Sequence, residues 1–361
     1  MDIKNAVGKV LGAVRLNQIV NEFFALDIGT TAVRVCQLTQ KTPTEWHLTK
    51  YAVTPIDEQT STSSAIADRK RLGEVILETV KAANITTKNV AAGVPSSKVF
   101  STVIEVMDVP ERELPSAVSY QAENVIPTNA DETKIDWALL GQSLANKEKL
   151  EVLITSVTNE YVEGQLDFLE DIGLNVISFE PDSIALARAI LPRNITSNHV
   201  IIDVGDYSTD ILVTVGDNPR LIRSVSFGLK NLVRTASGGL NIKPEEAEQY
   251  IFKFGLNQQA LEGKLMLSIN TFIEQFTTEL NKTIKYVNDK YPGIKIDSSL
   301  LSGYSVMIPG FAELIASHVG GQANFATPWQ NVVVPPELQQ QVAPISAQFA
   351  VVVGLAEKEV H

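Results

Sequence analysis

LDIGTT, at residues 26–31, is the stretch from which the fold can be inferred, because an apolar strand ends there in Asp27 and then turns through Gly29. A second stretch, IDVGDYST at residues 202–209, repeats this device. Glycine lets backbone N–H groups approach phosphate oxygens, hydroxyl groups add donors, and an aspartate at a strand end can hold Mg²⁺ through water. Two such turns therefore predict a clamp for a nucleotide. The residues expected to bind ATP in these turns are Asp27, Gly29, Thr30, Thr31, Asp203, Gly205, Ser208 and Thr209, with Asp27 and Asp203 also holding Mg²⁺ through water.

A third element supports this interpretation, since one Asp-x-Gly turn alone also occurs in ordinary hairpins. LLSGYSVMIPG, at residues 300–310, predicts an apolar strand over 299–308 that leads into a glycine turn and the start of a helix. A glycine there lets the backbone pass under a purine, and the N-terminus of the following helix can face the ribose and phosphates. The expected adenosine-binding residues are Gly303, Tyr304 and Gly310.

The composition indicates a folded protein of more than one lobe. The chain has 361 residues, and a single core seldom grows beyond about 250–300 residues. Its net charge of −12 argues against nucleic acid as a partner, because binding to phosphate backbones requires clustered Lys and Arg. The single cysteine, Cys36, excludes a disulfide framework and a thiolate metal site, as is typical of the reducing cytoplasm. No stretch reaches the ~20 apolar residues of a membrane span.

The hydrophobic pattern predicts an α/β protein with an inserted unit. Apolar residues recur at helical spacing over 65–83 and over 111–126, and short apolar runs between such stretches indicate strands. Residues 1–22 predict an amphipathic basic helix that either packs on its own domain or lies on a membrane or a partner. We expect this helix at 1–22, a first-lobe core at 23–97, an inserted subdomain at 98–175, a return to the first lobe at 176–198, and a second lobe at 199–361 with a helical subdomain at about 243–298.

The order of two hairpins and a glycine turn resembles the two phosphate motifs and the adenosine motif of the actin and sugar-kinase superfamily. Within it, the chain resembles the PilM family of type IV pilus assembly proteins and the related FtsA proteins over nearly its whole length. The resemblance implies an actin-like, RNase H-like, two-lobed ATPase fold with an FtsA-type inserted subdomain. It rests on the three motifs and on the stretches 99–110, 120–127, 184–189, 244–248, 327–329 and 352–356.

The resemblance also implies a function. It predicts a cytoplasmic scaffold that binds ATP and Mg²⁺ and docks the N-terminal cytoplasmic tail of a PilN-like inner-membrane protein, so that partners hold it at the inner membrane. Other pilus assembly proteins and further copies of the chain are possible partners. The alternatives are an FtsA-like filament that tethers a division apparatus, and a small-molecule kinase of the same superfamily. ATP turnover is expected to be slow at most, because no evident base stands near the phosphate turns.

Three positions depart from the family pattern. Tyr304 replaces the second glycine of the adenosine turn and either stacks on adenine or obstructs it. A glycine pair of the family becomes Gly228-Leu229. Glu180-Pro181-Asp182 stands where the family has the two acidic residues in the reverse order. Either of these carboxylates can orient an attacking water or cap the following helix, and we expect capping.

Overall fold

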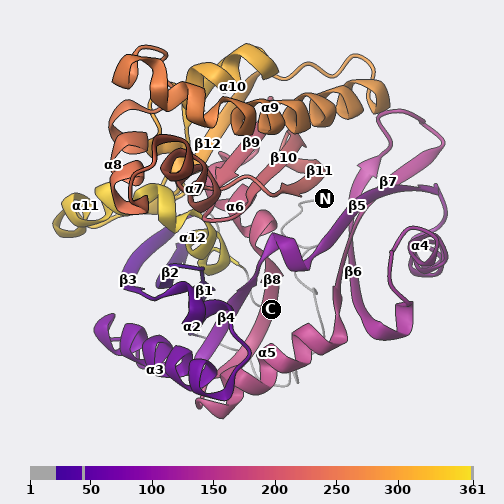
Figure 1. Cartoon of the computed structure of the whole chain (residues 1–361). Helices are drawn as coiled ribbons and strands as arrows, with labels where there is room; N and C mark the ends of the chain where they lie inside the picture. The colour runs from indigo at the N-terminus through magenta and orange to yellow at the C-terminus, as the bar shows by residue number, and fades with distance from the viewer. Residues whose placement is uncertain (1–21, 43–44, 359–361) are drawn as a thin grey trace. The chain divides into compact units, whose positions relative to one another are not determined.

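The computed structural model describes residues 22–42 and 45–358, so the helix expected at 1–22 lies almost entirely outside the described residues. Contacts divide the chain into two compact units. Unit 1 comprises the residues up to Arg193 together with those from Thr327 on, and unit 2 comprises Asn194–Ala326. Each unit is built on its own β-sheet (Figure 1).

The main sheet of unit 1 has six strands among the described residues, in the order β14-β3-β2-β1-β4-β8. β1 and β2 form an antiparallel hairpin, whereas β1, β4 and β8 run parallel to one another. The central strands are almost continuously apolar, as is typical of parallel strands buried on both faces. The strands are β1 (Phe24–Ile28), β2 (Ala32–Thr42), β3 (Glu45–Pro55), β4 (Asn89–Val94), β8 (Asn175–Pro181) and β14 (Val332–Val333).

Two pairs of helices cover this sheet. α6 and α12 pack on each other, and α12 contacts β1, β2 and β4. α3 contacts β2 and β3, and α5 contacts β8 (Figure 1). α3 confirms the helix expected over 65–83, and its buried residues lie on one face at helical spacing. The helices are α2 (Glu58–Thr62), α3 (Ile66–Ala82), α5 (Asn159–Asp171), α6 (Asp182–Ile190), α11 (Pro336–Val342) and α12 (Ala350–Ala356).

A second, smaller sheet of unit 1 lies within the expected insertion at 98–175. Its antiparallel strands have the order β5-β7-β6, and α4 packs on one of its faces. The helix expected over 111–126 is shorter than predicted, because Pro115 sits in its first turn and α4 begins at Leu114. The elements are β5 (Phe100–Met107), α4 (Leu114–Glu123), β6 (Thr133–Gln142) and β7 (Lys149–Thr158).

Unit 2 repeats the topology of unit 1. In the part that the structure describes, its sheet has the order β11-β10-β9-β12-β13, which corresponds strand for strand to β3-β2-β1-β4-β8. β9 and β10 are antiparallel and β9 and β12 are parallel, as are their counterparts in unit 1. The strands are β9 (Asn198–Val204), β10 (Thr209–Val215), β11 (Asn218–Val225), β12 (Ser298–Gly303) and β13 (Gln322–Phe325).

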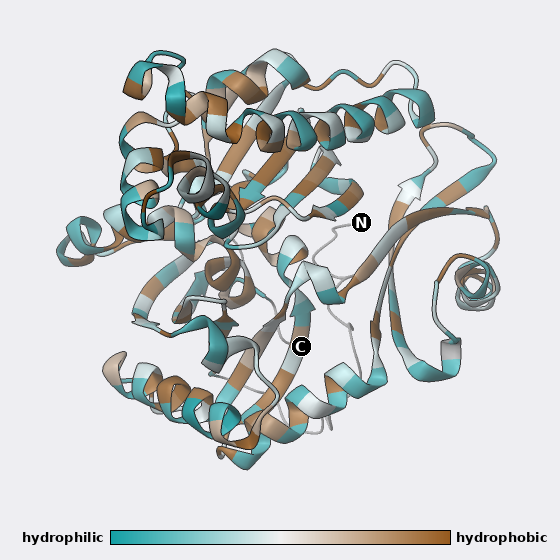
Figure 2. Cartoon of the chain, viewed as in Figure 1, coloured by the Kyte–Doolittle hydropathy of each residue, from teal (hydrophilic) through white to brown (hydrophobic). Residues whose placement is uncertain are grey.

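The helices of unit 2 bury their apolar faces in one core. Figure 2 shows apolar residues concentrated along the strands, whereas α9 carries polar residues on its outward side. Phe227 stacks on Phe272 of α9 with ring centroids 4.9 Å apart. α9 runs for 27 residues, about 40 Å at 1.5 Å per residue. The helices are α7 (Leu229–Leu240), α8 (Pro244–Phe254), α9 (Lys264–Lys290) and α10 (Phe311–Val319).

Two expectations need correction. The second lobe was expected to extend over 199–361, but the residues from Thr327 on belong to unit 1. β14 pairs with β3, and Gly354 of α12 approaches α6 so closely that a Cβ there would overlap the carbonyl oxygen of Ala185. The strand expected over 299–308 ends at Gly303, because the φ of +64° at that glycine leaves the extended conformation and the 3₁₀ helix η5 (Tyr304–Met307) follows.

Candidate functional site

The first predicted turn connects β1 and β2 of unit 1. The N–H of Gly29 donates a hydrogen bond to the carbonyl of Ala32 over 3.0 Å, which closes the turn. The Thr30 carbonyl accepts a hydrogen bond from the Ser61 hydroxyl at 2.6 Å, and the Thr31 carbonyl accepts one from the N–H of Ile56 at 3.0 Å. The neighbouring elements thus hold the turn through its carbonyl groups.

Asp27 lies opposite Arg34 in the hairpin. The two residues are register partners, and Nη1 of Arg34 lies 3.2 Å from Oδ2 of Asp27. Both side chains are largely buried, and a Cβ at Gly29 would lie 2.9 Å from Nη1. A guanidinium therefore stands beside the turn, where an anion would meet it. Sequence reasoning missed Arg34, although counting residues through the hairpin would have placed it opposite Asp27.

The second predicted turn, in unit 2, has the same closure. The N–H of Gly205 donates to the carbonyl of Ser208 over 2.9 Å, as Gly29 does in the first turn. The start of α7 then contacts the turn, because the N–H of Leu229 donates to the Gly205 carbonyl at 3.0 Å and the N–H of Lys230 donates to the carbonyl of Asp206 at 2.8 Å. The N-terminal end of a helix, which carries a partial positive charge, thus borders this turn.

Thr209 does not serve as predicted. Its side chain is fully buried, and its hydroxyl donates a hydrogen bond of 2.7 Å to the carbonyl of Phe227. This hydroxyl is therefore not available to a phosphate. Ser208, which precedes it, remains partly exposed.

The structure brings Asp203 and Gly303 together. β12 pairs in parallel with β9, so that Gly303 lies beside Val204. A Cβ at Gly303 would overlap the Val204 carbonyl oxygen and lie 2.9 Å from Oδ1 of Asp203. A glycine is required at this position both by the positive φ and by the close approach of the two strands. Within unit 2, the second predicted phosphate turn and the predicted adenosine turn are thus adjacent.

Tyr304 packs against Phe252 of α8. The ring centroids are 6.5 Å apart, and the ring planes differ by 23°. Sequence reasoning did not identify Phe252, which is distant from Tyr304 along the chain. Gly310 precedes α10 with a φ of +82°, and its Cα faces Leu256, to which a Cβ would come within 3.3 Å. Gly310 therefore has a clear structural role at the start of this helix.

Glu180 is fully buried in unit 1 and is bound by Arg188. Both carboxylate oxygens of Glu180 accept hydrogen bonds from the guanidinium, and Nη1 of Arg188 also donates to the Gly354 carbonyl at 2.7 Å. Burial acts to raise the pKa of Glu180, but the charges of Arg188 and Lys358 outweigh it and hold the pKa below its usual range. Arg188 of α6 therefore connects to both β8 and α12, and the Glu180 carboxylate is held in this ion pair rather than free to orient a water.

Asp182 does not cap α6 as expected. The N-cap residue is Pro181, whose side chain makes no capping hydrogen bond. Asp182 is the first residue of α6, where its negative charge interacts favourably with the positive end of the helix dipole. Its carboxylate packs over Gly93, since a Cβ at that glycine would overlap Oδ1.

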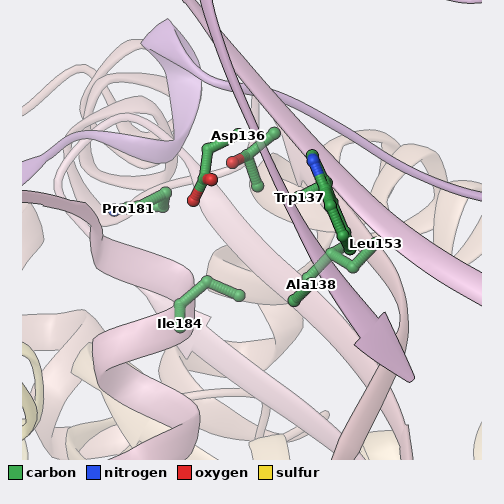
Figure 3. Close-up of a pocket in the computed structure, with 7 residues that line it drawn as sticks. Asp136, Trp137, Ala138, Leu153, Pro181 and Ile184 are labelled. Atoms are coloured by element: carbon green, nitrogen blue, oxygen red, sulfur yellow. The ribbon is translucent and has the colours of Figure 1, made fainter. Parts of the chain in front are cut away.

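A recess lies in unit 1 between the smaller sheet and the start of α6. The recess is small and partly open to solvent, and its walls are mostly apolar. Figure 3 shows the carboxylate of Asp136 on the wall that β6 contributes, opposite Pro181 and Ile184. Burial raises the pKa of Asp136 to about 6, against the effects of the Trp137 N–H and of Lys358. The lining residues are Asp136, Trp137, Ala138, Leu153, Thr155, Pro181 and Ile184.

The described residues contain no cluster of side chains suited to hold a metal by protein ligands alone. Within the same part of the chain, no helix is both long and apolar enough to cross a membrane.

Comparison with known proteins shows what this chain resembles. The model of the family "Type IV pilus assembly protein PilM" matches residues 25–360. A PilM-PilN type IV pilus biogenesis complex contains a chain that is 22% identical, with a TM-score of 0.79, and the match covers 94% of this chain and 99% of that one.

Two further structures are similar in fold. The ethanolamine utilization protein EutJ from Carboxydothermus hydrogenoformans is 13% identical, with a TM-score of 0.52 and coverage of 97% of this chain and 93% of that one. MreB5 of Spiroplasma citri bound to ADP is 11% identical, with a TM-score of 0.52 and coverage of 93% and 95%. These matches confirm the expected actin-like fold.

Proposed function

The chain belongs to the PilM family of type IV pilus assembly proteins, and we propose that it is an ATP-binding scaffold to which the N-terminal tail of a PilN-like inner-membrane protein docks. Docking to such a tail would hold the protein at the cytoplasmic side of the inner membrane. At that place the protein would be within reach of other pilus assembly proteins.

The recess in unit 1 is the observation that carries the proposal. It is bordered by β6, an edge strand of the smaller sheet, and by the start of α6 in the main body of the unit. Apolar lining with one polar group is what a peptide anchor requires, because the apolar walls supply affinity and the polar group fixes orientation. An extended tail can lie along an edge strand and insert a side chain into such a recess.

The two turns and Gly303 support nucleotide binding. In each turn the glycine leaves the backbone uncovered by a side chain, as close approach of a phosphate requires, and Arg34 adds a cation beside the first turn. Asp27 and Asp203 are the carboxylates that would hold Mg²⁺ through water. Bound Mg²⁺ would compete with Arg34 for the Asp27 carboxylate. Arg34 would then be released to pair with a phosphate, so the metal and the phosphates would bind together.

Slow or absent ATP turnover fits a scaffold. Glu180 is engaged by Arg188, so its carboxylate would have to leave a buried ion pair before it oriented a water. Nucleotide would then act by stabilising one conformation that partners bind. The filament-forming alternative is not favoured by the family to which the chain belongs.

Calorimetry with a synthetic peptide tests the proposal. The peptide is the cytoplasmic N-terminal tail of the PilN-type protein encoded by the same organism, and the full chain should bind it with micromolar or better affinity. Ala138→Leu fills the recess and is expected to abolish binding, whereas Ala145→Leu, at an exposed position of the same subdomain, should not.

A second control addresses the other unit. Leu267 is an exposed residue of α9, and Leu267→Ser is expected to leave binding unchanged. If Leu267→Ser abolished binding while Ala138→Leu preserved it, the docking site would lie in the helical region of unit 2 and the assignment would be refuted. Circular dichroism melting of each variant excludes unfolding as the cause.

A further inference from the structure

Asp136 is the one ionisable residue among those that line the recess. In β6, side chains alternate between the two faces of the sheet, so Asp136 and Ala138 lie on the same face. This face is turned away from α4 and toward Pro181 and Ile184 (Figure 3). The carboxylate is therefore presented to the space that we assign to the docked tail.

This carboxylate has no ion-pair partner among the described residues. The charge of Lys358 favours ionisation of Asp136, but the Nζ of Lys358 donates its hydrogen bond to the Ser178 hydroxyl, at 2.8 Å. Glu180, whose charge opposes ionisation of Asp136, is itself bound by Arg188. Burial is the main reason that the pKa of Asp136 is raised to about 6, and the charge of Lys358 offsets it only in part. A cation that approaches a carboxylate in such surroundings stabilises its ionised form.

We propose that the recess binds an apolar side chain of the tail together with an adjacent lysine or arginine, and that Asp136 selects for this cation. The inference rests on the proposed docking of a PilN-like tail and adds the chemistry that the tail must have. An apolar residue of the tail would cover the apolar walls that β6 and α6 form, while the cation would pair with Asp136. A tail with a neutral or acidic residue at that position would leave Asp136 unpaired and would bind more weakly.

The chain's own residues 1–21 are a second source of the same chemistry, since they place Lys4, Lys9 and Arg15 among apolar residues. We assign the cation to the partner because the chain is similar to one found in a complex of PilM with PilN. The experiment therefore includes the full-length triple variant Lys4→Gln, Lys9→Gln and Arg15→Gln.

The test measures calorimetric affinities of the tail peptide and of analogues in which each Lys or Arg is replaced by Gln. For the wild-type protein, one replacement is expected to weaken binding roughly tenfold or more. For Asp136→Asn the same replacement should change affinity less than about twofold, because no carboxylate remains to pair with. Asp131→Asn, an exposed carboxylate of the same subdomain, and the triple variant should both behave like the wild type.

The affinity is also expected to depend on pH. Because a cation binds the ionised form, affinity for the wild type should rise from pH 5 to pH 7 and then level off, and Asp136→Asn should remove this rise. Lys358 and Glu180 are the other charged groups that act on Asp136. Burial lowers the pKa of Lys358, and the charges of Arg188 and Lys358 lower that of Glu180.

Three outcomes would overturn the inference. The first is that the peptide binds well, but that replacing its Lys or Arg by Gln weakens binding to the wild type and to Asp136→Asn by the same factor. Asp136 would then not be the selecting group, although the proposed function would stand. If the triple variant abolished the pH dependence, the cation would come from the chain itself. If the peptide did not bind the wild type at all, the proposed function and the inference would fall together.

Discussion

The buried ion pair between Glu180 and Arg188 is expected to be the most sensitive polar contact of unit 1. Glu180 has an exposed fraction of 0%, and Arg188 also donates to the Gly354 carbonyl at 2.7 Å. Arg188→Met would remove the cation and leave a buried carboxylate and a buried carbonyl without these donors. Removing one partner of a buried pair costs about 3–5 kcal/mol. For a unit of this size, that corresponds to a fall of roughly 6–20 °C in melting temperature.

The pH dependence provides an independent signature. The pKa of Glu180 is lowered in the folded protein, so its contribution to stability is present above its unfolded pKa and is lost as the pH falls through the folded pKa. In Arg188→Met the buried carboxyl takes up a proton that the wild type does not bind. The difference in unfolding free energy between the two proteins should therefore grow with pH, by up to about 1.4 kcal/mol per pH unit.

Thermal unfolding of the full chain, followed by circular dichroism between pH 4 and pH 8, checks both expectations. Arg71→Met is the matched control, because Arg71 pairs with Glu74 at an exposed site and such a pair contributes less than about 1 kcal/mol. Glu180→Gln combined with Arg188→Met should recover part of the loss, since the buried carboxylate that lost its guanidinium partner is also removed. If Arg188→Met melted within the range of the Arg71→Met control at pH 7, the reasoning would be refuted.

Nucleotide binding is tested at the three turns. Asp27→Ala and Asp203→Ala are each expected to weaken Mg-ATP binding in calorimetry, because each removes a carboxylate proposed to hold the metal; unchanged affinity in both would contradict that placement. Tyr304→Gly is expected to change ATP affinity measurably, because the ring follows the adenosine turn and stacks on Phe252. Equal affinities would mean that the ring does not reach the base. Gly303→Ala should destabilise unit 2 by about 1–3 kcal/mol, because alanine is strained at a φ of +64° and its Cβ would overlap the Val204 carbonyl; a melting temperature equal to that of the wild type would show that β9 and β12 can separate at no cost.

The sequence predicted the turns correctly, but not the partners of the side chains around them. The aspartate and glycine of each turn were recognisable because a turn depends on residues adjacent in sequence, whose conformations glycine determines locally. Arg34 was missed, although it lies in the same hairpin, because its position opposite Asp27 depends on strand register. Thr209 was misjudged for a similar reason, since its hydroxyl is bound by Phe227, which belongs to a different element.

The sequence by itself determined the class of fold, the duplicated turns and the family, because these depend on local patterns of apolar residues and glycine. Only the tertiary structure decided that the residues from Thr327 on return to unit 1, since this follows from the pairing of β14 with β3 and the close approach of α12 to α6. It also decided that Glu180 is paired with Arg188 and that Asp136 is the one ionisable residue lining an apolar recess. Burial and pairing depend on which distant segments pack together, and such packing has no signature in any short stretch of sequence.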